Sequence, residues 1–546
     1  MQPPYAITLD VGSSRANKTG AWRVERPVYV DRLPPCNDAC PAGENIQRWL
    51  YHAEAGDYEA AWRQLVDDNP LPAIMGRICY HPCESACNRA ELDEAVGINA
   101  VERFLGDHAI ARGWRFDPPP AETGRRVLVV GSGPSGLSAA YHLRRRGHAV
   151  TLVDQAEELG GMMRYGIPAY RLPRDVLDDE IERILALGVE VVTGRRIDDL
   201  AAEKEAGAYD AVYLAVGAQI GRRTEIPAGD SARILDALSL LHQVAAGDPP
   251  LLGRRVAVYG GGNTAMDAAR TLRRLGATDA VVVYRRTPKE MPAHADELAD
   301  ALHEGVQARW LTTVKSFEGG RLVLEKVRLE GRDVVPTGEF EELPADALVL
   351  ALGQDSDLSL VEKAAGVAVE HGAVSVDDAM ETGAMGIFAG GDVVPGERTA
   401  TVAVGHAKHA ARAIDAFLRG ETLAPPPRHP LATFDRLNTW YYTDADRQRR
   451  PELETARRRS TFDEVVGPLR EDNALFEARR CLSCGNCFEC DNCYGVCPDN
   501  AVDKLDLAAS AAAGRHYAFD YDYCKGCGIC VAECPCGAID LVPEVI

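Results

Sequence analysis

The chain has 546 residues, 46% hydrophobic and 26% charged, so it is long enough for three or more ordinary globular domains. Its formal net charge of −22 argues against a nucleic-acid binder, which requires clustered positive charge. No apolar stretch has membrane-spanning length, and Met1–Trp22 carries Asp10, Gly12 and Asn17 where a signal peptide needs an apolar run, so we expect a cytoplasmic protein.

The sixteen cysteines gather near the two ends of the chain. Five lie between Cys36 and Cys87, and the other eleven lie between Cys481 and Cys536. Because disulfides are unusual in a reducing compartment, such short spacings predict metal sites at both ends.

Residues 36–115 have the pattern of a mainly helical domain. Helices are predicted at Ile46–Ala55 and Tyr58–Val66, separated by Gly56 and Asp57. The proline-rich run DPPPAET at 117–123 then ends the helical pattern and predicts a linker.

Short apolar strands alternate with helices from this linker to a second proline cluster at 424–430, which predicts an α/β region. Within it, a strand-turn-helix pattern occurs twice. The basic runs at 144–146 and 457–459 are typical of solvated helix faces, although docking of an acidic electron carrier is an alternative.

The first strand-turn-helix, RRVLVVGSGPSGLSAAYHL, has the glycine spacing of a dinucleotide-binding loop. Gly131 permits the tight turn, Gly133 admits the pyrophosphate, and Gly136 lets helix pack on strand. Asp154 ends the next strand, where a carboxylate can bind a ribose 2′-hydroxyl. The alternative is an ordinary glycine turn. The candidate residues of this loop are Gly131, Ser132, Gly133, Pro134, Ser135, Gly136 and Asp154.

The second copy, RRVAVYGGGNTAMDAARTL, has Gly260 and Gly262 in the first two glycine places and Ala265 in the third. Its next strand ends in Arg285 and Arg286 instead of an acid. Arginine can bind the 2′-phosphate of NADP bidentately, so this copy predicts NADPH over NADH, the alternative being mere surface charge. Its candidate residues are Gly260, Gly262, Asn263, Thr264, Arg285 and Arg286.

A third signal, GIFAGGDVVPG, places Gly391 and Asp392 directly after a short apolar strand, where they can receive a flavin and its sugar-like chain. With the two dinucleotide loops, it predicts one unit for FAD and one for the nicotinamide. No Cys-x-x-Cys pair lies between Gly131 and Leu418, which excludes a dithiol relay. We name no catalytic acid or base, because hydride transfer is chemistry of the cofactors.

A polar stretch from Leu431 to Arg480 follows, and its aromatics Trp440, Tyr441 and Tyr442 suggest that it packs on the body of the protein. The terminal segment then repeats C-x2-C-x2-C-x3-C-P twice, the pattern of a two-cluster bacterial ferredoxin in which the fourth cysteine of each run ligates the other cluster. Zinc is the alternative. One predicted [4Fe-4S] set is Cys487, Cys490, Cys493 and Cys534, and the other is Cys524, Cys527, Cys530 and Cys497.

Three terminal cysteines are left over: Cys481, Cys484 and Cys536. Ligands of a further metal or cluster and surplus structural thiols are both open for them.

The chain resembles the family of the glutamate synthase small subunit and the NADPH-side domains of dihydropyrimidine dehydrogenase. The resemblance covers residues 36–418 and rests on CPAGENI, GRICYHPCESAC, VGINAVE, GSGPSG, GGMMRYGIP, GGGNTAMD, YRR with Met291 and Pro292, and AGGD. It implies a multidomain α/β protein with an N-terminal helical iron-sulfur domain and an NADPH domain inserted into an FAD domain. It also assigns the first loop, Gly161 and Asp392 to FAD, and the second loop to NADPH.

The expected domains follow from this resemblance and the ferredoxin-like α+β repeat. They are 1–120 (extension and helical iron-sulfur domain), 123–225 and 346–422 (FAD), 226–345 (NADPH), 423–480 (linker) and 481–546 (ferredoxin-like).

The N-terminal cysteines depart from the family pattern C-x2-C-x4-C-x3-C-P, which serves two clusters. Val28 and Asp31 occupy its first two places, so the resemblance implies that one cluster is lost. It implies that the other uses Cys40, Cys79, Cys83 and Glu102, with Cys36 or Cys87 as alternatives to Glu102.

The predicted function is electron transfer between NADPH, FAD, [4Fe-4S] clusters and a ferredoxin or catalytic partner subunit, in either direction. The partner could be a 2-oxoacid oxidoreductase or a low-potential reductase. A glutamate synthase small subunit and a non-catalytic iron-sulfur sensor or scaffold are the alternatives.

Overall fold

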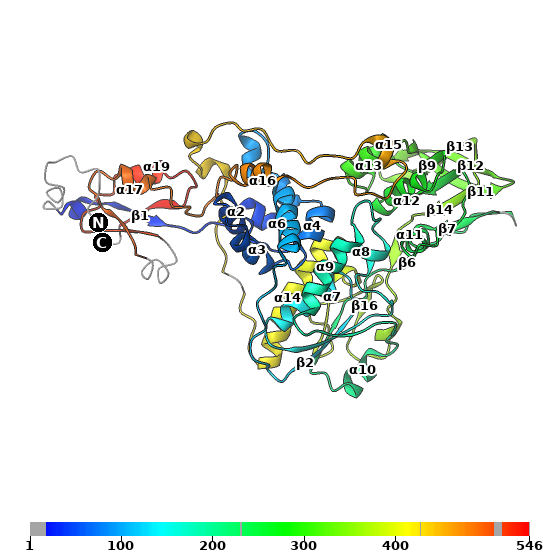
Figure 1. The fold of residues 1–546 in the computed structure, drawn as a ribbon, viewed down its shortest axis with the longest axis horizontal. Helices are drawn as coiled ribbons and strands as arrows, with labels where there is room; N and C mark the ends of the chain where they lie inside the picture. The colour runs from blue at the N-terminus through cyan, green and yellow to red at the C-terminus, as the bar shows by residue number, and fades with distance from the viewer. Residues whose placement is uncertain (1–17, 230–231, 426, 507–515, 545–546) are drawn as a thin grey trace.

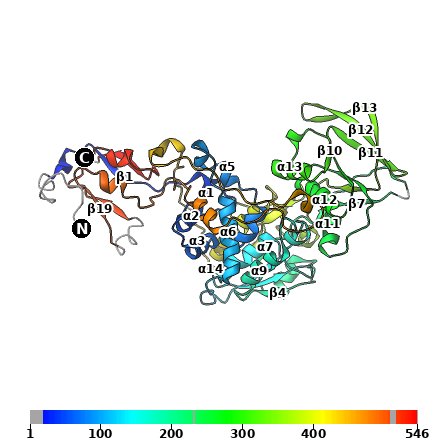
Figure 2. The same cartoon turned by 45° about the horizontal axis from the view of Figure 1, so that its top comes forward.

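The computed structural model describes residues 18–229, 232–425, 427–506 and 516–544, so Asp10, Gly12 and Asn17 lie outside the described residues. The molecule is elongated, with a small cysteine-rich domain at one end, a helical domain in the middle, and two sheet domains beyond it (Figure 1). Figure 2 shows the second sheet domain and the cysteine-rich domain on opposite sides of the helices.

The helical domain contains both helices expected from the sequence. Asn45 and Asp57 cap the helices α2 and α3, because their side chains accept bonds from the backbone N–H groups of Arg48 and Ala60. Close packing of α4 on α6 requires glycine, since a Cβ at Gly106 would lie 2.3 Å from the backbone nitrogen of Ala73. The helices are α1 (Pro35–Ala39), α2 (Ile46–Glu54), α3 (Tyr58–Val66), α4 (Pro72–Ile78), α5 (Pro82–Ser85) and α6 (Ile98–Arg112).

The first sheet domain is a parallel five-stranded sheet in the order β18-β5-β2-β3-β4. Helices α7 and α14 pack together on it, and Glu180 of α9 caps α4 by accepting bonds from the N–H groups of Ala73 and Ile74 at 3.1 and 3.0 Å. The helical domain is thereby fixed to this sheet. Its elements are β2 (Arg126–Val130), α7 (Pro134–Arg144), β3 (Ala149–Val153), α8 (Met162–Tyr165), α9 (Arg174–Leu185), β4 (Glu190–Val192), α10 (Leu200–Ala206), β5 (Ala211–Leu214), β18 (Ile387–Ala389) and α14 (Ala400–Arg419).

The second sheet domain has five parallel strands in the order β10-β9-β8-β14-β7, with the antiparallel sheet β11-β12-β13 beside them. Strand β14 pairs with β8, so this domain extends to Leu350 and the predicted boundary at 345 is too early. Sequence pattern did not show this, because β14 is as apolar as any strand of the first sheet. The elements are β7 (Ile234–Asp236), α11 (Ala237–Ala245), β8 (Arg255–Tyr259), α12 (Asn263–Arg274), β9 (Asp279–Val283), α13 (Ala295–His303), β10 (Gln307–Arg309), β11 (Thr312–Glu318), β12 (Arg321–Glu330), β13 (Asp333–Pro344) and β14 (Ala347–Leu350).

Short two-stranded pairs complete the central region. They are β6 (Ile220–Gly221) with β15 (Gln354–Asp355), which lie where the chain passes between the two sheet domains, and β16 (Val369–Glu370) with β17 (Ala373–Val374).

The cysteine-rich domain takes a strand from the beginning of the chain. Strand β1 pairs antiparallel with β21, from Glu25 opposite Pro543 to Tyr29 opposite Ile539. The described residues before about 30 therefore belong with the terminal domain and not with the helical domain predicted for 1–120. The elements are β1 (Glu25–Tyr29), α17 (Asn492–Val496), β19 (Val502–Lys504), β20 (Tyr517–Phe519), α19 (Ile529–Ala532) and β21 (Ile539–Pro543).

Residues 431–480 form a strap that runs from the cysteine-rich domain to α13 and back to the helical domain (Figure 1). It contains α15 (Thr455–Arg458) and α16 (Glu471–Ala478). The strap packs on the body as predicted, but its aromatics contribute unequally: Trp440 is 86% exposed, whereas the half-buried Tyr442 donates its hydroxyl to the carbonyl oxygen of Leu482 at 3.1 Å. Buried arginines also hold it: Arg458 pairs with Asp300 at 2.6 Å and with Glu304 at 3.2 Å.

The two basic runs are only partly solvated. Arg144 and Arg458 are buried in ion pairs with Glu122 and with Glu304, so neither run is the uniformly exposed face that the sequence suggested. Among the described residues, no helix combines the length and apolar character needed to cross a bilayer.

Candidate functional site

A cavity of about 770 Å³ lies where the two glycine-rich loops face each other across the two sheet domains. Both loops open at the carboxyl ends of parallel strands, where α/β sheets bind ligands. Of the sixteen cofactor-binding residues predicted from sequence, Gly136 alone does not line it. The lining set is Gly131, Ser132, Gly133, Pro134, Ser135, Asp154, Gly161, Gly260, Gly262, Asn263, Thr264, Arg285, Arg286, Gly391 and Asp392.

Among the three glycines of the first loop, only Gly133 has open space beside its Cα for a phosphate-containing ligand. A Cβ at Gly133 would meet no atom within 4 Å, so this backbone faces open space in the cavity wall. A Cβ at Gly136 would lie 1.8 Å from the carbonyl oxygen of Gly131, so Gly136 serves helix packing. The loop therefore fits a dinucleotide pyrophosphate at the N-terminus of α7.

Asp154 lies in the cavity wall at the end of β3, but its carboxylate is already engaged. It accepts bonds from the backbone N–H and the hydroxyl of Ser132, both at 2.6 Å, and from the N–H of Ala156 at 2.8 Å. Because a carboxylate has about four acceptor sites, one remains for a ribose hydroxyl.

The second loop repeats the glycine arrangement of the first, but the strand that follows it ends in arginines where the first unit has Asp154. Gly262 also faces open space, and fully buried Ala265 packs where the first loop has its third glycine. Arg285 is exposed and Arg286 half-buried at the end of β9, and both line the cavity. Two guanidinium groups at this end suit a 2′-phosphate.

Several residues of the cavity wall were not expected from sequence. Gln354 donates to the hydroxyl of Thr264 at 3.0 Å, and Arg398 donates to the carbonyl oxygen of Gln354 at 2.7 Å. Burial raises the pKa of nearby Asp392, while the charge of Arg398 lowers it. No local motif marks Gln354 or Arg398, since they join the site only through the arrangement of the two sheets.

Tyr80 also lines the cavity, and it comes from the helical domain. Its ring stacks on His294 of the second sheet domain, with ring centroids 3.5 Å apart. Because Tyr80 follows Cys79, this contact joins the large cavity to the N-terminal cysteines.

The predicted N-terminal ligands Cys40, Cys79, Cys83 and Glu102 line one small cavity of about 10 Å³. Glu44, which sequence did not indicate, lines it as well, and Asn69 donates to both carboxylates at 3.0 and 2.9 Å. Burial raises the pKa of Glu44 to about 7 and that of Cys79 to about 12. Buried thiols and carboxyls of this kind fit a cation or cluster that stabilises their charged forms.

Cys36 and Cys87, the alternatives to Glu102, do not reach that cavity. They line a separate one of about 20 Å³ together with Cys481 and Cys484. In this structure, Glu102 lines the cavity of Cys40, Cys79 and Cys83, whereas its two alternatives line the other cavity.

The terminal cysteines lie close together in the cysteine-rich domain, and the fourth cysteine of the first run lies with the second run. Cys497 lines a cavity of about 20 Å³ with Cys524, Cys527 and Cys530. Cys534 lies on the side of the first run, because its charge acts on the thiols of Cys487, Cys490 and Cys493. The sulfur atoms of Cys536 and Cys534 lie 3.7 Å apart, and this contact lowers the pKa of Cys534.

Three protein families match successive parts of the chain. The family "Pyridine nucleotide-disulphide oxidoreductase" matches residues 125–407. "Dihydroprymidine dehydrogenase domain II, 4Fe-4S cluster" matches residues 25–114, and "4Fe-4S dicluster domain" matches residues 486–538. Cys481 and Cys484 lie outside both iron-sulfur matches.

Curated relatives align over most of the chain. The NADP(+)-dependent formate dehydrogenase subunit beta of Moorella thermoacetica is 35% identical, covering 82% of this chain and 70% of that protein. The NADPH-Fe(3+) oxidoreductase subunit beta of Geobacter sulfurreducens is 30% identical, covering 84% and 77%. The glutamate synthase [NADPH] small chain of Mycobacterium tuberculosis is 32% identical, covering 73% and 89%.

Proposed function

Since the chain belongs to the pyridine nucleotide-disulphide oxidoreductase family, we propose that it is the NADPH-facing subunit of a larger redox assembly. It is an NADPH-dependent oxidoreductase with FAD and [4Fe-4S] clusters. Its proposed role is to carry electrons between NADPH and a ferredoxin or a catalytic partner subunit.

The observation that supports this role is the single cavity shared by both dinucleotide loops, with Tyr80 in its wall beside Cys79. The first loop, Gly161, Gly391 and Asp392 would hold FAD, and Arg285 and Arg286 would hold the 2′-phosphate of NADPH. Bound FAD supplies the conversion between hydride transfer and single-electron transfer. The residues of this chain bind and orient the two dinucleotides, and no side chain is assigned a proton-transfer step.

The proposed cluster ligands are the three sets that line the small cysteine cavities or lie beside them. Cys40, Cys79, Cys83 and Glu102 would hold the N-terminal cluster next to the flavin. The terminal pair would use Cys487, Cys490, Cys493 and Cys534, and Cys524, Cys527, Cys530 and Cys497.

The proposed partner is a protein, because the three named relatives include subunits of a formate dehydrogenase and an Fe(3+) oxidoreductase. A formate-oxidising, a 2-oxoacid-oxidising or a metal-reducing subunit would each suit the electron-carrying part described here. We also propose a cytoplasmic location, since all sixteen cysteines are free and cluster assembly needs reduced thiols.

The second candidate is a glutamate synthase small subunit, favoured by the alignment with 89% of the mycobacterial small chain. Co-purification with a large synthase subunit would support it. Co-purification with a dehydrogenase subunit would support the first proposal.

The proposed function is tested by anaerobic titration with NADPH and, separately, with NADH. We expect NADPH to bleach the flavin absorbance near 450 nm and then the broad cluster absorbance, with NADH reacting more slowly. A flavin that NADPH does not bleach would contradict the proposal and favour a non-catalytic sensor or scaffold.

A further inference from the structure

Four cysteines that neither iron-sulfur family match brings together line one small cavity. Cys36 and Cys87 come from the helical domain, and Cys481 and Cys484 come from the segment directly after the strap. About 400 residues separate the two pairs along the chain, and the fold places all four in the wall of the same space.

We propose that Cys36, Cys87, Cys481 and Cys484 hold an additional [4Fe-4S] cluster. The inference rests on the proposed function for the role of this cluster in electron transfer, but not for its existence.

The cavity has the size and lining of the other cysteine cavities. It measures about 20 Å³, against about 20 Å³ for the cavity of Cys497, Cys524, Cys527 and Cys530 and about 10 Å³ for that of Cys40, Cys79 and Cys83. Buried apolar residues, including Leu50, Val96 and Ile98, line it together with the four half-buried cysteines. Four cysteines in one wall are the ligand number of a [4Fe-4S] cluster.

A single zinc ion is the alternative occupant, because it also binds four thiolates, each about 2.3 Å from the metal. The iron, sulfide and zinc contents of the purified protein therefore decide between the two.

Hydrogen bonds to sulfur follow the pattern of the neighbouring sites. The N–H of Ser483 donates to Cys481 Sγ at 3.4 Å, as the N–H of His81 does to Cys79 Sγ at 3.2 Å. The amide of Asn88 donates to Cys484 Sγ at 3.4 Å. Donors aimed at ligand sulfurs stabilise thiolates and tune cluster potentials.

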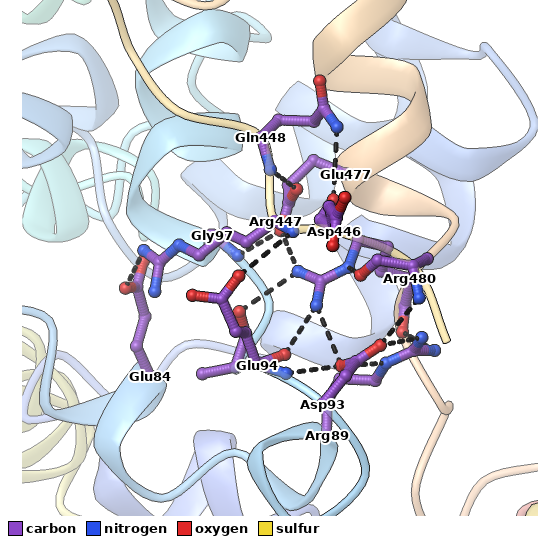
Figure 3. A network of polar contacts seen from close by, with 12 residues as sticks. Glu84, Arg89, Asp93, Glu94, Gly97, Asp446, Arg447, Gln448, Glu477 and Arg480 are labelled. Carbon is purple, nitrogen blue, oxygen red and sulfur yellow. Dashed lines mark hydrogen bonds and ion pairs between the residues drawn. The ribbon is translucent and has the colours of Figure 1, made fainter. Parts of the chain in front are cut away.

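A buried ion network joins the two halves of the site (Figure 3). Arg480 precedes Cys481, and it bonds to Glu477 at 2.6 Å and to Asp93 at 3.0 Å. Arg89, two residues after Cys87, binds the same Asp93 and also the backbone carbonyl oxygen of Arg480 at 3.2 Å. Both arginines are at most 3% exposed, so Cys481 and Cys484 are held rigidly against the helical domain.

The number of available ligands also matches the number that the proposed clusters require. The two N-terminal places that the sequence lacks, Val28 and Asp31, lie at or just beyond strand β1, and the segment after the strap supplies two cysteines to the same set instead. Four clusters take sixteen ligands, which fifteen of the sixteen cysteines and Glu102 would provide. Cys536 is the one cysteine left without a cluster.

The site lies between the other cluster sites. Ile98 lines both this cavity and that of Cys40, Cys79 and Cys83, and Cys484 stands three residues before Cys487. A cluster here would accept one electron from the N-terminal cluster and pass it to the terminal pair, which connects flavin and ferredoxin-type clusters through the helical domain.

The test is to purify the full chain anaerobically as wild type, Cys481→Ser/Cys484→Ser and Cys536→Ser, and to measure iron, sulfide, zinc and FAD per chain. We expect about 16 irons in the wild type and in Cys536→Ser, and about 12 in the double variant. One [4Fe-4S]⁺ signal should also disappear from the electron paramagnetic resonance spectrum of the dithionite-reduced double variant.

An unchanged FAD content shows that the double variant has folded. If instead it has lost FAD, Cys36→Ser replaces it, with the same four-iron loss expected. The inference is overturned if the wild type contains about 12 irons per chain and the variants contain the same number. It is also overturned if the double variant loses zinc and keeps its iron. Neither measurement depends on reduction by NADPH. Failure of the proposed function would appear in the NADPH titration, whereas failure of this inference would appear in the metal content.

Discussion

At the residue scale, Arg285 and Arg286 are the only groups proposed to distinguish NADPH from NADH. Both line the cavity at the end of β9, and neither has a carboxylate partner among the ion pairs described for this chain. Arg286 donates instead to the carbonyl oxygen of Arg332 at 3.2 Å, and its charge also acts on the exposed Glu290. A 2′-phosphate would be a stronger anionic partner, because a guanidinium can bind it bidentately.

Arg285→Ala should therefore weaken NADPH binding selectively. We expect the apparent KM for NADPH to rise about 10- to 100-fold, since a hydrogen bond to a charged group contributes about 1.5–3 kcal/mol. The KM for NADH should not change. Initial rates of anaerobic flavin reduction measure both values, and Lys289→Ala is the matched control, because Lys289 is an exposed cation of the following turn that does not line the cavity. An equal effect on NADH would contradict the assignment.

A second residue-scale prediction concerns Tyr29, whose hydroxyl lies 3.4 Å from Cys493 Sγ and whose ring stacks on Phe519. A donor to a ligand thiolate stabilises the reduced, more negative cluster. Tyr29→Phe keeps the stacked ring and removes the donor, so the midpoint potential of one terminal cluster should become more negative in a potentiometric titration. Tyr521→Phe serves as control, because its hydroxyl bonds to the carbonyl oxygen of Pro27 and not to sulfur. Equal shifts in both variants would show that the sulfur contact is irrelevant.

At the scale of elements, the strap is held to the second sheet domain by buried charge. Arg458 is 2% exposed and shares Glu304 with Arg270 and Arg274. Burial opposes the charged form, but Arg274 and Arg270 lower the pKa of Glu304 to about 2, so the carboxylate is charged near neutral pH. The strap therefore places a buried arginine against the buried carboxylate that follows α13.

Arg458→Ala should release the strap locally. We expect the free energy of local opening to fall by about 3 kcal/mol, the lower end for a broken buried pair, because Glu304 keeps its other arginines. Chymotryptic cleavage after Phe462 should then accelerate by about 100-fold or more. The adjacent Arg457→Ala is the control, since Arg457 is an exposed partner of Asp463. Equal cleavage of the two variants would contradict the role of Arg458.

The elements also show what the sequence can and cannot predict. Glycine spacing identified both dinucleotide loops, and capping residues such as Asn45 and Asp57 marked helices that the structure contains. These signals are local. The pairing of β1 with β21 joins residues about 500 apart, and the meeting of Cys87 with Cys481 depends on how the strap returns to the helical domain. Neither leaves a local pattern, because each is decided by long-range packing.

At the scale of the whole molecule, the cofactor sites lie in series. The large cavity touches the helical domain through Tyr80, whereas the cysteine-rich domain lies on the far side of the helices (Figure 2). Contacts of the cysteine-rich domain run to the helical domain, for example from Tyr51 to Glu489 at 3.1 Å. Electrons that leave the flavin for a partner at that end would therefore cross the clusters.

This arrangement predicts that loss of a terminal cluster separates the two half-reactions. Cys527 is exposed and lines the cavity with Cys497, Cys524 and Cys530, so it marks an outer cluster that a partner could approach. In Cys527→Ala, NADPH should bleach the flavin at the wild-type rate, because the dinucleotide cavity is unaltered. Reduction of an added two-cluster [4Fe-4S] ferredoxin by NADPH should fall to the rate without enzyme, since the last carrier is missing.

Both rates are measured by anaerobic stopped flow, with Cys536→Ala as the control that removes a buried terminal thiol but no proposed ligand. If Cys527→Ala still reduces ferredoxin as fast as wild type, electrons leave the flavin by another surface and the serial route is wrong. If flavin bleaching slows as well, the terminal domain influences NADPH binding, and the separation of the two half-reactions fails.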